Sequence, residues 1–231
     1  MFAKYSLLAA SECDAIVADL EPLPWAGGLA PGQSYRDKVK RNKEIALQMS
    51  PDTAVADEHL RLITSKILAS QFLKERILGK SLVNPRFNLY EGGAFYGKHA
   101  DSAFMGGAPR QIRTDISATL FLCDPASYDG GELVLDYPSG ATASIKEPQG
   151  TLVFYPSGVM HQVTPVTRGR RIAFVAWIES HIQNPQMRDI LTEITALCED
   201  LNATDLALGE LHMRAINIKH NLFRIWWKNE E

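Results

Sequence analysis

Residues 150–180 read GTLVFYPSGVMHQVTPVTRGRRIAFVAWIES, and this stretch decides the fold. Two apolar runs rich in β-branched and aromatic residues, 151–155 and 171–178, lie on either side of a segment that contains proline and glycine. Such runs, bounded by turn residues, are typical of strands. We therefore expect His161 in a loop or at a strand start. We expect Arg171 to begin a buried strand and to carry one cation inward.

The same texture of short apolar or alternating runs, interrupted by Gly, Pro and Asp, extends over residues 81–180. The expected strands are Phe87–Tyr90, Ile116–Leu122, Glu132–Asp136, Ala143–Ile145, Thr151–Tyr155 and Arg171–Ile178. Strands of this kind, closing around a cavity, suit a double-stranded β-helix of the jelly-roll type. The expected fold is a mainly β core with flanking N-terminal and C-terminal α-helices.

Helical patterns precede the β region, and residues 1–80 are expected to form an N-terminal helical support. Ser11–Asp14 is expected to cap a helix that runs to about Leu20. A longer helix is expected from Asp57, with Gly79 as its stop. Between them, the Gly- and Pro-containing segment 22–51 is expected to be irregular and to lie over the surface.

Helical patterns return after the jelly roll of residues 81–180, in a C-terminal region that covers residues 181–231. Asn184 and Pro185 fit a helix N-cap followed by proline in the first turn. A second helix is expected to start near Thr204 and Asp205. Apolar stripes on both helices are expected to pack against the sheet or against each other. Alternatively, the tail forms a contact between two copies of the chain, as a homodimer.

A candidate metal site begins with His99-Ala100-Asp101. On an extended chain, residues i and i+2 point to the same side, so both potential ligands can face one cavity. Fe(II) accepts two histidines and one carboxylate on one face of an octahedron, which leaves three positions for a chelating cosubstrate and dioxygen. His161 is the candidate third ligand. A buried Arg171 needs an anionic partner, which the far end of a dicarboxylate would supply.

Each of these residues taken alone has a more ordinary explanation. An isolated His-x-Asp is more often an exposed polar pair, and Arg171 alone is more often a salt-bridged strand end. The combination is more specific than its parts. The remaining histidines lack a partner at ligand spacing and are expected to be structural; they are His59, His181, His212 and His220.

Four motifs together identify a family resemblance. They are residues 88–101 (NLYEGGAFYGKHAD), 118–122 (ATLFL), 130–133 (GGEL) and 155–171 (YPSGVMHQVTPVTRGRR). In these motifs the chain resembles the Fe(II)/2-oxoglutarate dioxygenases of the prolyl-hydroxylase-like group, and within it the bacterial PKHD-type hydroxylases, also called iron-uptake-factor-like. The resemblance implies the jelly-roll fold as well.

By this resemblance His99, Asp101 and His161 are the iron ligands, and Arg171 holds the distal carboxylate of 2-oxoglutarate. Tyr90 stands where related prolyl hydroxylases place a tyrosine that bonds the cosubstrate, although a tyrosine simply packed in the sheet is the alternative. Related iron halogenases lack the carboxylate ligand, so the presence of Asp101 favours hydroxylation or another oxidation over halogenation.

Arg168 and Arg170 compete with Arg171 for the cosubstrate. Strand alternation favours Arg171, because it shares a face with Ala173 and Val175 while Arg170 falls on the other side.

The implied activity is hydroxylation of an unidentified small-molecule or peptide substrate with O2, giving succinate and CO2. Fe(II) is the implied metal, 2-oxoglutarate the cosubstrate and L-ascorbate a supporting reductant, and a link to iron acquisition is implied by the resemblance alone. The alternative is a non-catalytic jelly-roll protein that binds a metal or small ligand as a sensor or storage module. The segment Met105–Pro109 is either a substrate lid or an ordinary loop.

Composition narrows the partners and the compartment. The formal net charge is −3 and no long basic run is present, so nucleic acid is not expected as a partner. The longest apolar run, 172–178, is too short to cross a bilayer, and no secretion signal is evident. The three cysteines are widely spaced, which disfavours a disulfide framework and a zinc site. We therefore expect a cytoplasmic protein with no membrane partner.

Overall fold

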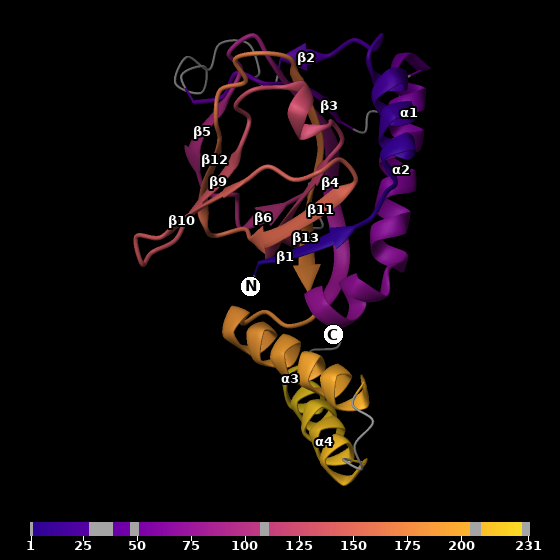
Figure 1. The fold of residues 1–231 in the computed structure, drawn as a ribbon, viewed down its shortest axis with the longest axis vertical. Coiled ribbons are helices and arrows are strands. Elements are labelled where there is room, and N and C mark those ends of the chain that lie inside the picture. The colour runs from indigo at the N-terminus through magenta and orange to yellow at the C-terminus, as the bar shows by residue number, and fades with distance from the viewer. Residues whose placement is uncertain (1, 28–38, 47–50, 107–110, 204–208, 228–231) are drawn as a thin grey trace.

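The computed structural model describes residues 2–27, 39–46, 51–106, 111–203 and 209–227. Two β-sheets form the core, two helices lie along one side of it, and a pair of helices projects from one end (Figure 1). The prediction of a mainly β jelly roll with flanking helices is confirmed. None of the described helices is long and apolar enough to cross a membrane.

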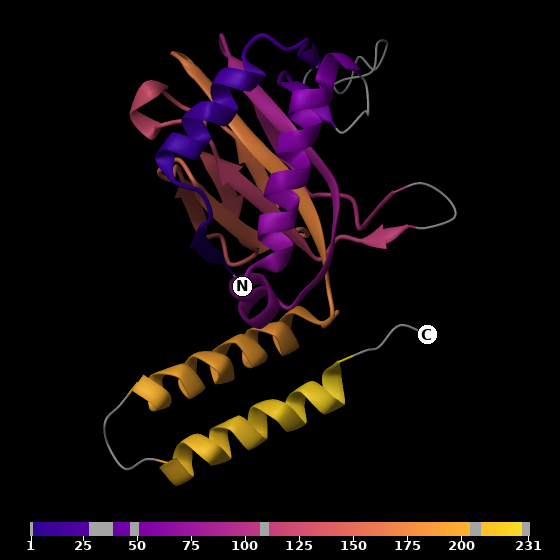
Figure 2. The ribbon, with the colours of Figure 1, turned by 90° about the vertical axis from the view of Figure 1, so that its right-hand side faces the viewer.

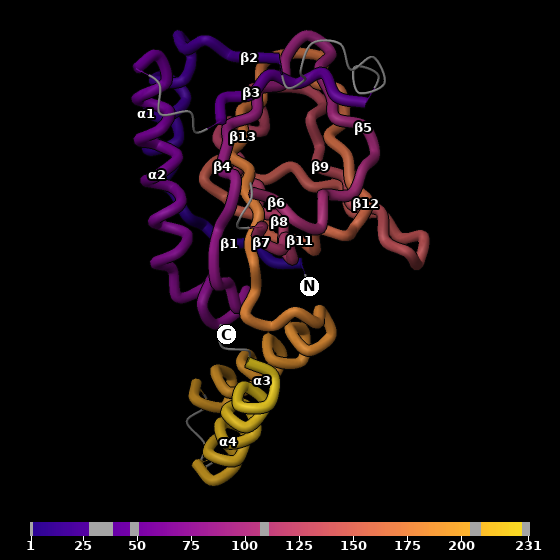
Figure 3. The backbone as a smooth tube through the Cα atoms, turned by 180° about the vertical axis from the view of Figure 1, so that it is seen from behind, coloured from indigo at the N-terminus to yellow at the C-terminus, as the bar shows by residue number. Residues whose placement is uncertain are grey.

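The larger sheet has seven strands, and all neighbours in it are antiparallel. In spatial order they are β1 (Ala3–Ser6), β11 (Thr151–Pro156), β8 (Ile116–Phe121), β13 (Arg170–Ser180), β4 (Gly79–Glu91), β3 (Lys43–Ala46) and β2 (Ala26–Gly27). The smaller sheet has the order β10 (Thr142–Ile145), β9 (Leu133–Asp136), β12 (Met160–Val163) and β5 (Tyr96–His99). Figure 3 shows the ring of strands from behind.

The strand β8 shows how the larger sheet separates two environments. All six of its residues are buried, because alternate side chains enter different layers. Ile116 and Leu120 belong to the main apolar core, which also includes buried residues of the N-terminal helices. Ser117 and Thr119 point the other way and line a cavity between the sheets. The polar side chains of this apolar run therefore mark the face of the sheet that borders the cavity.

The first helix, α1 (Ala10–Leu20), ends at the predicted residue, but the prediction of its cap at Ser11 is wrong. The N-cap is Ala9, whose backbone N–H donates to Oε2 of Glu12 at 2.8 Å. Glu12 thus makes one half of a capping box by itself. An alanine cap has no side-chain signal, which is why the sequence placed the start two residues late.

The second helix, α2 (Ala54–Ala69), follows a short 3₁₀ turn, η2 (Pro51–Thr53), and stops well before Gly79. Ser70 ends it, because its hydroxyl donates to the carbonyl of Ile67 at 2.8 Å and its backbone is extended. A short π-helical turn, η3 (Leu73–Ile77), leads to Leu78 in the left-handed conformation (φ 55°). Gly79 then begins β4 rather than ending a helix.

Residues 1–80 supply more than the expected helical support. The strand β1 pairs with β11 at one edge of the larger sheet, and β3 pairs with β4 towards the other. The irregular segment expected over 22–51 contains β2 and β3, while residues 28–38 and 47–50 of it lie outside the described residues. The N-terminal region is therefore partly built into the sheet.

The two β-sheets together with α1 and α2 are called the barrel. The C-terminal helices α3 (Pro185–Ala203) and α4 (Gly209–Trp226) lie side by side and antiparallel beneath it (Figure 2). The predicted cap is confirmed, since Oδ1 of Asn184 accepts from the N–H of Gln186 at 2.8 Å. The predicted start of the second helix at Thr204–Asp205 lies outside the described residues. Arg76 of η3 pairs with Glu199 and so attaches α3 to the barrel.

Candidate active site

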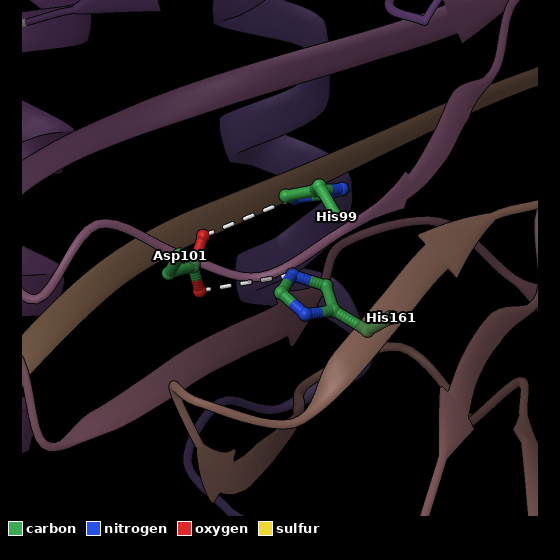
Figure 4. Close-up of side chains that lie close together, drawn as sticks. All are labelled: His99, Asp101 and His161. Carbon is green, nitrogen blue, oxygen red and sulfur yellow. Dashed lines mark ion pairs between the residues drawn. The ribbon is translucent and has the colours of Figure 1, made fainter.

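Two histidines lie side by side on neighbouring strands of the smaller sheet. His99 ends β5, His161 lies in β12, and the two are direct partners in the antiparallel register. Asp101 follows two residues after His99, and its side chain turns to the same point (Figure 4). Oxygen Oδ1 of Asp101 lies 3.8 Å from Nε2 of His99, and Oδ2 lies 3.7 Å from Nε2 of His161. One ligand atom from each residue falls within 4.8 Å of the other two, so the three can share one ion.

Backbone carbonyls fix the orientation of both imidazoles. Nδ1 of His99 lies 2.8 Å from the carbonyl oxygen of Gly97, and Nδ1 of His161 lies 2.9 Å from that of Val159. A carbonyl oxygen only accepts, so Nδ1 carries the proton and Nε2 presents its lone pair to the centre of the triad. Burial, followed by the charge of His161, lowers the pKa of His99 to about 4. His99 is therefore neutral at pH 7, as a metal ligand must be.

Two serines hold the carboxylate of Asp101. The hydroxyl of Ser117 on β8 donates to Oδ2 of Asp101 at 2.5 Å. The hydroxyl of Ser157 lies 2.9 Å from that of Ser117, and the carbonyl of Ser157 accepts from the N–H of Asp101 at 3.2 Å. Since Ser117 has a single hydroxyl proton, Ser157 is the donor in the pair of hydroxyls. Neither serine was predicted from the sequence, in which the only signal is the polar Ser117 inside an apolar strand.

Arg171 brings an unpaired positive charge into the same cavity. Its side chain is 1% exposed, and its guanidinium carbon lies 5.1 Å from the ring centroids of both Tyr90 and Phe121. Among the residues that the structure describes, its Nε and Nη2 have no hydrogen-bond partner and no carboxylate forms a salt bridge with it. A buried cation with open donors is costly unless an anion completes it.

The two competing arginines are engaged elsewhere. Arg168 is exposed and its Nε donates to Asp129 at 2.7 Å. Arg170 pairs with Glu21 at 2.5 Å and with Glu91 at 3.1 Å. Neither residue lines the cavity, because alternation along β13 turns Arg170 away from it.

Tyr90 lies opposite Arg171 in the register between β4 and β13. It lines the cavity and is 1% exposed, and burial raises the pKa of its phenol well above the usual range. The hydroxyl keeps its proton at any working pH and can donate to an anion held by Arg171. In the alternative, in which Tyr90 only packs in the sheet, its hydroxyl has no role in binding.

The cavity has a volume of about 470 Å³, within the usual size of small-molecule sites. Arg171 and Tyr90 line it, and so do His99, Asp101 and His161. Charged side chains also line it: Glu44 pairs with Lys40, and also with Arg86 at 3.3 Å. The guanidinium of Arg86 lies 5.3 Å from the ring centroid of Trp177. A second molecule can thus approach the triad from a polar side.

The segment expected as a lid or a loop is described only in part. Its first residue, Met105, ends β6 (Phe104–Met105), which pairs with β7 (Ile112–Arg113), and Met105 lines the cavity. Residues 107–109 lie outside the described residues, so the lid stays a prediction.

The histidines expected to be structural lie away from the triad. Nε2 of His59 pairs with Asp19 at 2.8 Å, and His181 stacks on Trp227 with ring centroids 3.9 Å apart. His212 and His220 are on α4. None of the four lines the cavity.

Comparison with known proteins agrees with this geometry. The family model of the 2OG-Fe(II) oxygenase superfamily matches residues 85–179, which include the triad and Arg171. A PKHD-type hydroxylase of Bordetella pertussis is 35% identical over 222 residues, with 95% of this chain and 96% of the relative covered. A PKHD-type hydroxylase of Teredinibacter turnerae is 38% identical over 225 residues, with coverages of 96% and 97%.

Solved structures give the same fold at lower identity. A prolyl-4-hydroxylase of Pseudomonas putida has a TM-score of 0.54 and 24% identity, over 78% of this chain and 92% of that one. A prolyl hydroxylase of Trichoplax adhaerens, in complex with a peptide fragment of the hypoxia inducible factor, has a TM-score of 0.55 and 15% identity over 84% and 86%. These likenesses concern the fold.

Proposed function

The chain belongs to the PKHD-type hydroxylases of the 2OG-Fe(II) oxygenase superfamily, and we propose that it binds Fe(II) through His99, Asp101 and His161 and 2-oxoglutarate through Arg171 and Tyr90. The substrate to be hydroxylated enters beside the charged side chains of Lys40, Glu44 and Arg86, which line the cavity. The membership makes the protein an oxygenase that depends on Fe(II) and 2-oxoglutarate; the residue assignments and the substrate are the proposal.

The observation that carries these assignments is that one cavity holds both an open triad of ligands and an unpaired, buried arginine. Two imidazoles and one carboxylate are the donor set of non-haem Fe(II) oxygenases and leave coordination positions free. A sensor or storage module for a metal needs no buried Arg171 aimed into the same space. The arginine therefore favours a dicarboxylate cosubstrate over the alternative of a silent jelly roll.

When bound, Fe(II) and 2-oxoglutarate supply the oxidation, in which O2 gives one oxygen atom to succinate and one to the product while CO2 leaves. The contribution of the chain is to bind and orient. Ser117 holds Asp101 in place, and the guanidinium of Arg171 receives the distal carboxylate in a two-pronged contact. The hydroxyl of Tyr90 keeps its proton and donates a hydrogen bond to the same carboxylate. Leu133 and Val163 line the cavity with apolar surface that excludes water.

Three finer points extend the proposal. Ascorbate serves as the reductant that restores Fe(II) after turnover without substrate, and the substrate is a small molecule or a peptide. The role in iron acquisition is supported by family resemblance alone.

The decisive experiment is an anaerobic titration of the metal-free protein with Fe(II) and then 2-oxoglutarate, followed by visible absorption. We expect a metal-to-ligand charge-transfer band in the wild type. His99→Ala should lose the band, and Arg171→Ala should need more cosubstrate to develop it. A wild-type protein that shows neither the band nor iron binding contradicts the proposal. Release of succinate then serves to screen small molecules and peptides as substrates.

A further inference from the structure

The C-terminal hairpin of α3 and α4 extends away from the active-site barrel. The helix α3 lies between the barrel and α4, and it is α3 that contacts η3 (Figure 2). Leu191 of α3 packs with Leu78 and Ile182 of the barrel side, and Leu222 and Trp226 of α4 pack against this cluster. The outer parts of the hairpin are therefore free to meet another molecule.

Both helices repeat apolar residues at alternating intervals of three and four. On α3 the series is Met187, Ile190, Ile194, Leu197 and Leu201, and on α4 it is Leu211, Ala215, Ile218, Leu222 and Ile225. This spacing is the seam of coiled coils and of four-helix bundles, in which each helix contacts two neighbours. A lone hairpin supplies only one neighbour for each helix.

Half of each seam is covered within the hairpin and half is left in solvent. Met187, Ile194 and Leu222 are partly buried in the cluster at the base of the hairpin, Leu201 is also partly buried, and Ala215 is 6% exposed. The other seam residues form what we call the apolar stripe: Ile190 (49% exposed), Leu197 (47%), Leu211 (49%), Ile218 (52%) and Ile225 (72%). Exposed large side chains are ordinary singly, but five at regular spacing indicate a contact surface.

The exposed residues of both helices lie on one face of the hairpin. Viewed along each helix from its N-terminus, the exposed residues are rotated about the helix axis in the same direction from the residues that face the other helix. Because the helices are antiparallel, equal displacements on the two helices bring both sets to the same side. The apolar stripe is thus one continuous surface that spans α3 and α4.

The charges at the outer edge of the stripe are acidic on α3 and, apart from Glu210 one turn before Arg214, basic on α4. On α3, exposed Glu193 and Asp200 each lie three residues after a member of the stripe. On α4, exposed Arg214 lies three residues after Leu211 and four before Ile218. These are the flanking positions that select partners in helical bundles. A two-fold axis places the acidic edge of one hairpin on the basic edge of another, so the surface is complementary to itself.

We propose that the apolar stripe binds a second copy of this chain, so that two hairpins form a four-helix bundle and the protein is a homodimer. Apolar residues then fill the centre of the bundle, and Glu193 and Asp200 face Arg214 of the other copy at its edge. A helix of 18 residues is about 27 Å long, which is sufficient for a bundle interface of ordinary size. The inference is independent of the chemistry in the barrel.

The test measures the mass of the full-length chain by light scattering or sedimentation equilibrium, at concentrations from about 1 to about 100 µM. We expect twice the chain mass of 25.6 kDa. Ile218→Lys places a charge in the middle of the stripe and should raise the dissociation constant about tenfold or more. Met213→Lys is the matched control, because Met213 is 62% exposed on the other side of α4. This control should dimerise as the wild type does.

Charge reversal tests the pairing of edges. Glu193→Arg and Arg214→Glu should each weaken the dimer, and the double variant should recover most of the loss. Circular dichroism and 2-oxoglutarate binding confirm that each variant is folded. A wild-type chain that stays monomeric over the whole concentration range overturns the proposal, and so does an Ile218→Lys variant that dimerises like the wild type.

Discussion

Arg171 is the residue whose surroundings are most informative, because a buried charge with open donors destabilises the folded chain until an anion binds. An arginine kept for stability would instead be paired, as Arg168 and Arg170 are. The same side chain should therefore have opposite effects on ligand binding and on the free energy of unfolding of the unliganded protein.

Arg171→Met tests this difference. We expect the dissociation constant of 2-oxoglutarate to rise by about two orders of magnitude, because a charge-assisted pair worth about 3 kcal/mol is lost. We expect the free energy of unfolding of the unliganded protein to stay the same or to increase. Anaerobic titration and urea denaturation measure the two quantities. Arg170→Met is the control and should leave cosubstrate binding unchanged; equal effects of the two variants would rule out the assignment.

Ser117→Ala tests the support of the carboxylate ligand. Without the 2.5 Å hydrogen bond, Asp101 loses its fixed orientation, and we expect the affinity for Fe(II) to fall by about 10- to 100-fold. Competition with a coloured chelator under anaerobic conditions measures the affinity. Ser102→Ala is the matched control, because Ser102 is exposed beside Asp101. An unchanged affinity in Ser117→Ala would show that the backbone alone positions Asp101.

At the scale of elements, the turn before β9 shapes the cosubstrate end of the cavity. Gly131 has φ +70°, and a Cβ at this position would come within 2.8 Å of Cδ of Arg171 and within 2.9 Å of Val166. Only glycine therefore lets the turn pass behind the arginine. Gly140, in the turn between β9 and β10, has φ +84° but no atom within 4 Å of an added Cβ.

Alanine variants of Gly131 and Gly140 distinguish the effect of backbone strain from the effect of displacing Arg171. Alanine at either position costs about 1–2 kcal/mol of stability through the left-handed backbone. Gly131→Ala should in addition displace Arg171 and weaken 2-oxoglutarate binding, while Gly140→Ala should leave binding unchanged. Thermal unfolding and cosubstrate titration of both variants check this. Equal cosubstrate affinities in the two variants would mean that the arginine tolerates the shift.

The elements that the sequence predicted are those with long local patterns. The six expected strands exist, and the cap at Asn184 was readable from its type and from the proline after it. His161 lies at the start of β12, one of its two expected positions, but the extent of β12 and the whole of β5 were not predicted, because these four-residue strands pair with residues far apart in the chain. For the same reason β4 begins at Gly79 instead of Phe87: the partner strand β13 is long and extends it beyond its apolar part.

The site was predictable to the extent that its chemistry needs distinctive residue types. Histidine, aspartate and arginine at motif spacing can be recognised one by one, but Ser117 and Ser157 are common residues whose role arises only from contact. A motif also cannot show which arginine is unpaired, since that depends on Glu21, Glu91 and Asp129.

At the scale of the whole molecule, the cavity joins the two sheets. The candidate ligands come from β5 and β12 of the smaller sheet and the loop after β5, whereas Tyr90, Ser117 and Arg171 come from three strands of the larger sheet. The unfolded chain cannot keep these residues together. A metal and a dicarboxylate that bind at this junction should therefore stabilise the entire barrel, not only the site.

Ligand binding should thus appear as a rise in the melting temperature. Mn(II) with 2-oxoglutarate serves as a pair that does not react, and at a hundredfold excess over its dissociation constant a ligand adds about 2.7 kcal/mol of stability. For a chain of this length each kcal/mol raises the melting temperature by roughly 2–4 °C, so we expect a rise of about 5–10 °C. His161→Ala should abolish the rise because a ligand is missing. His59→Ala should keep it in full, because His59 pairs with Asp19 outside the cavity. If His161→Ala shows the same rise as the wild type, the metal binds elsewhere and the assignment of the triad is wrong.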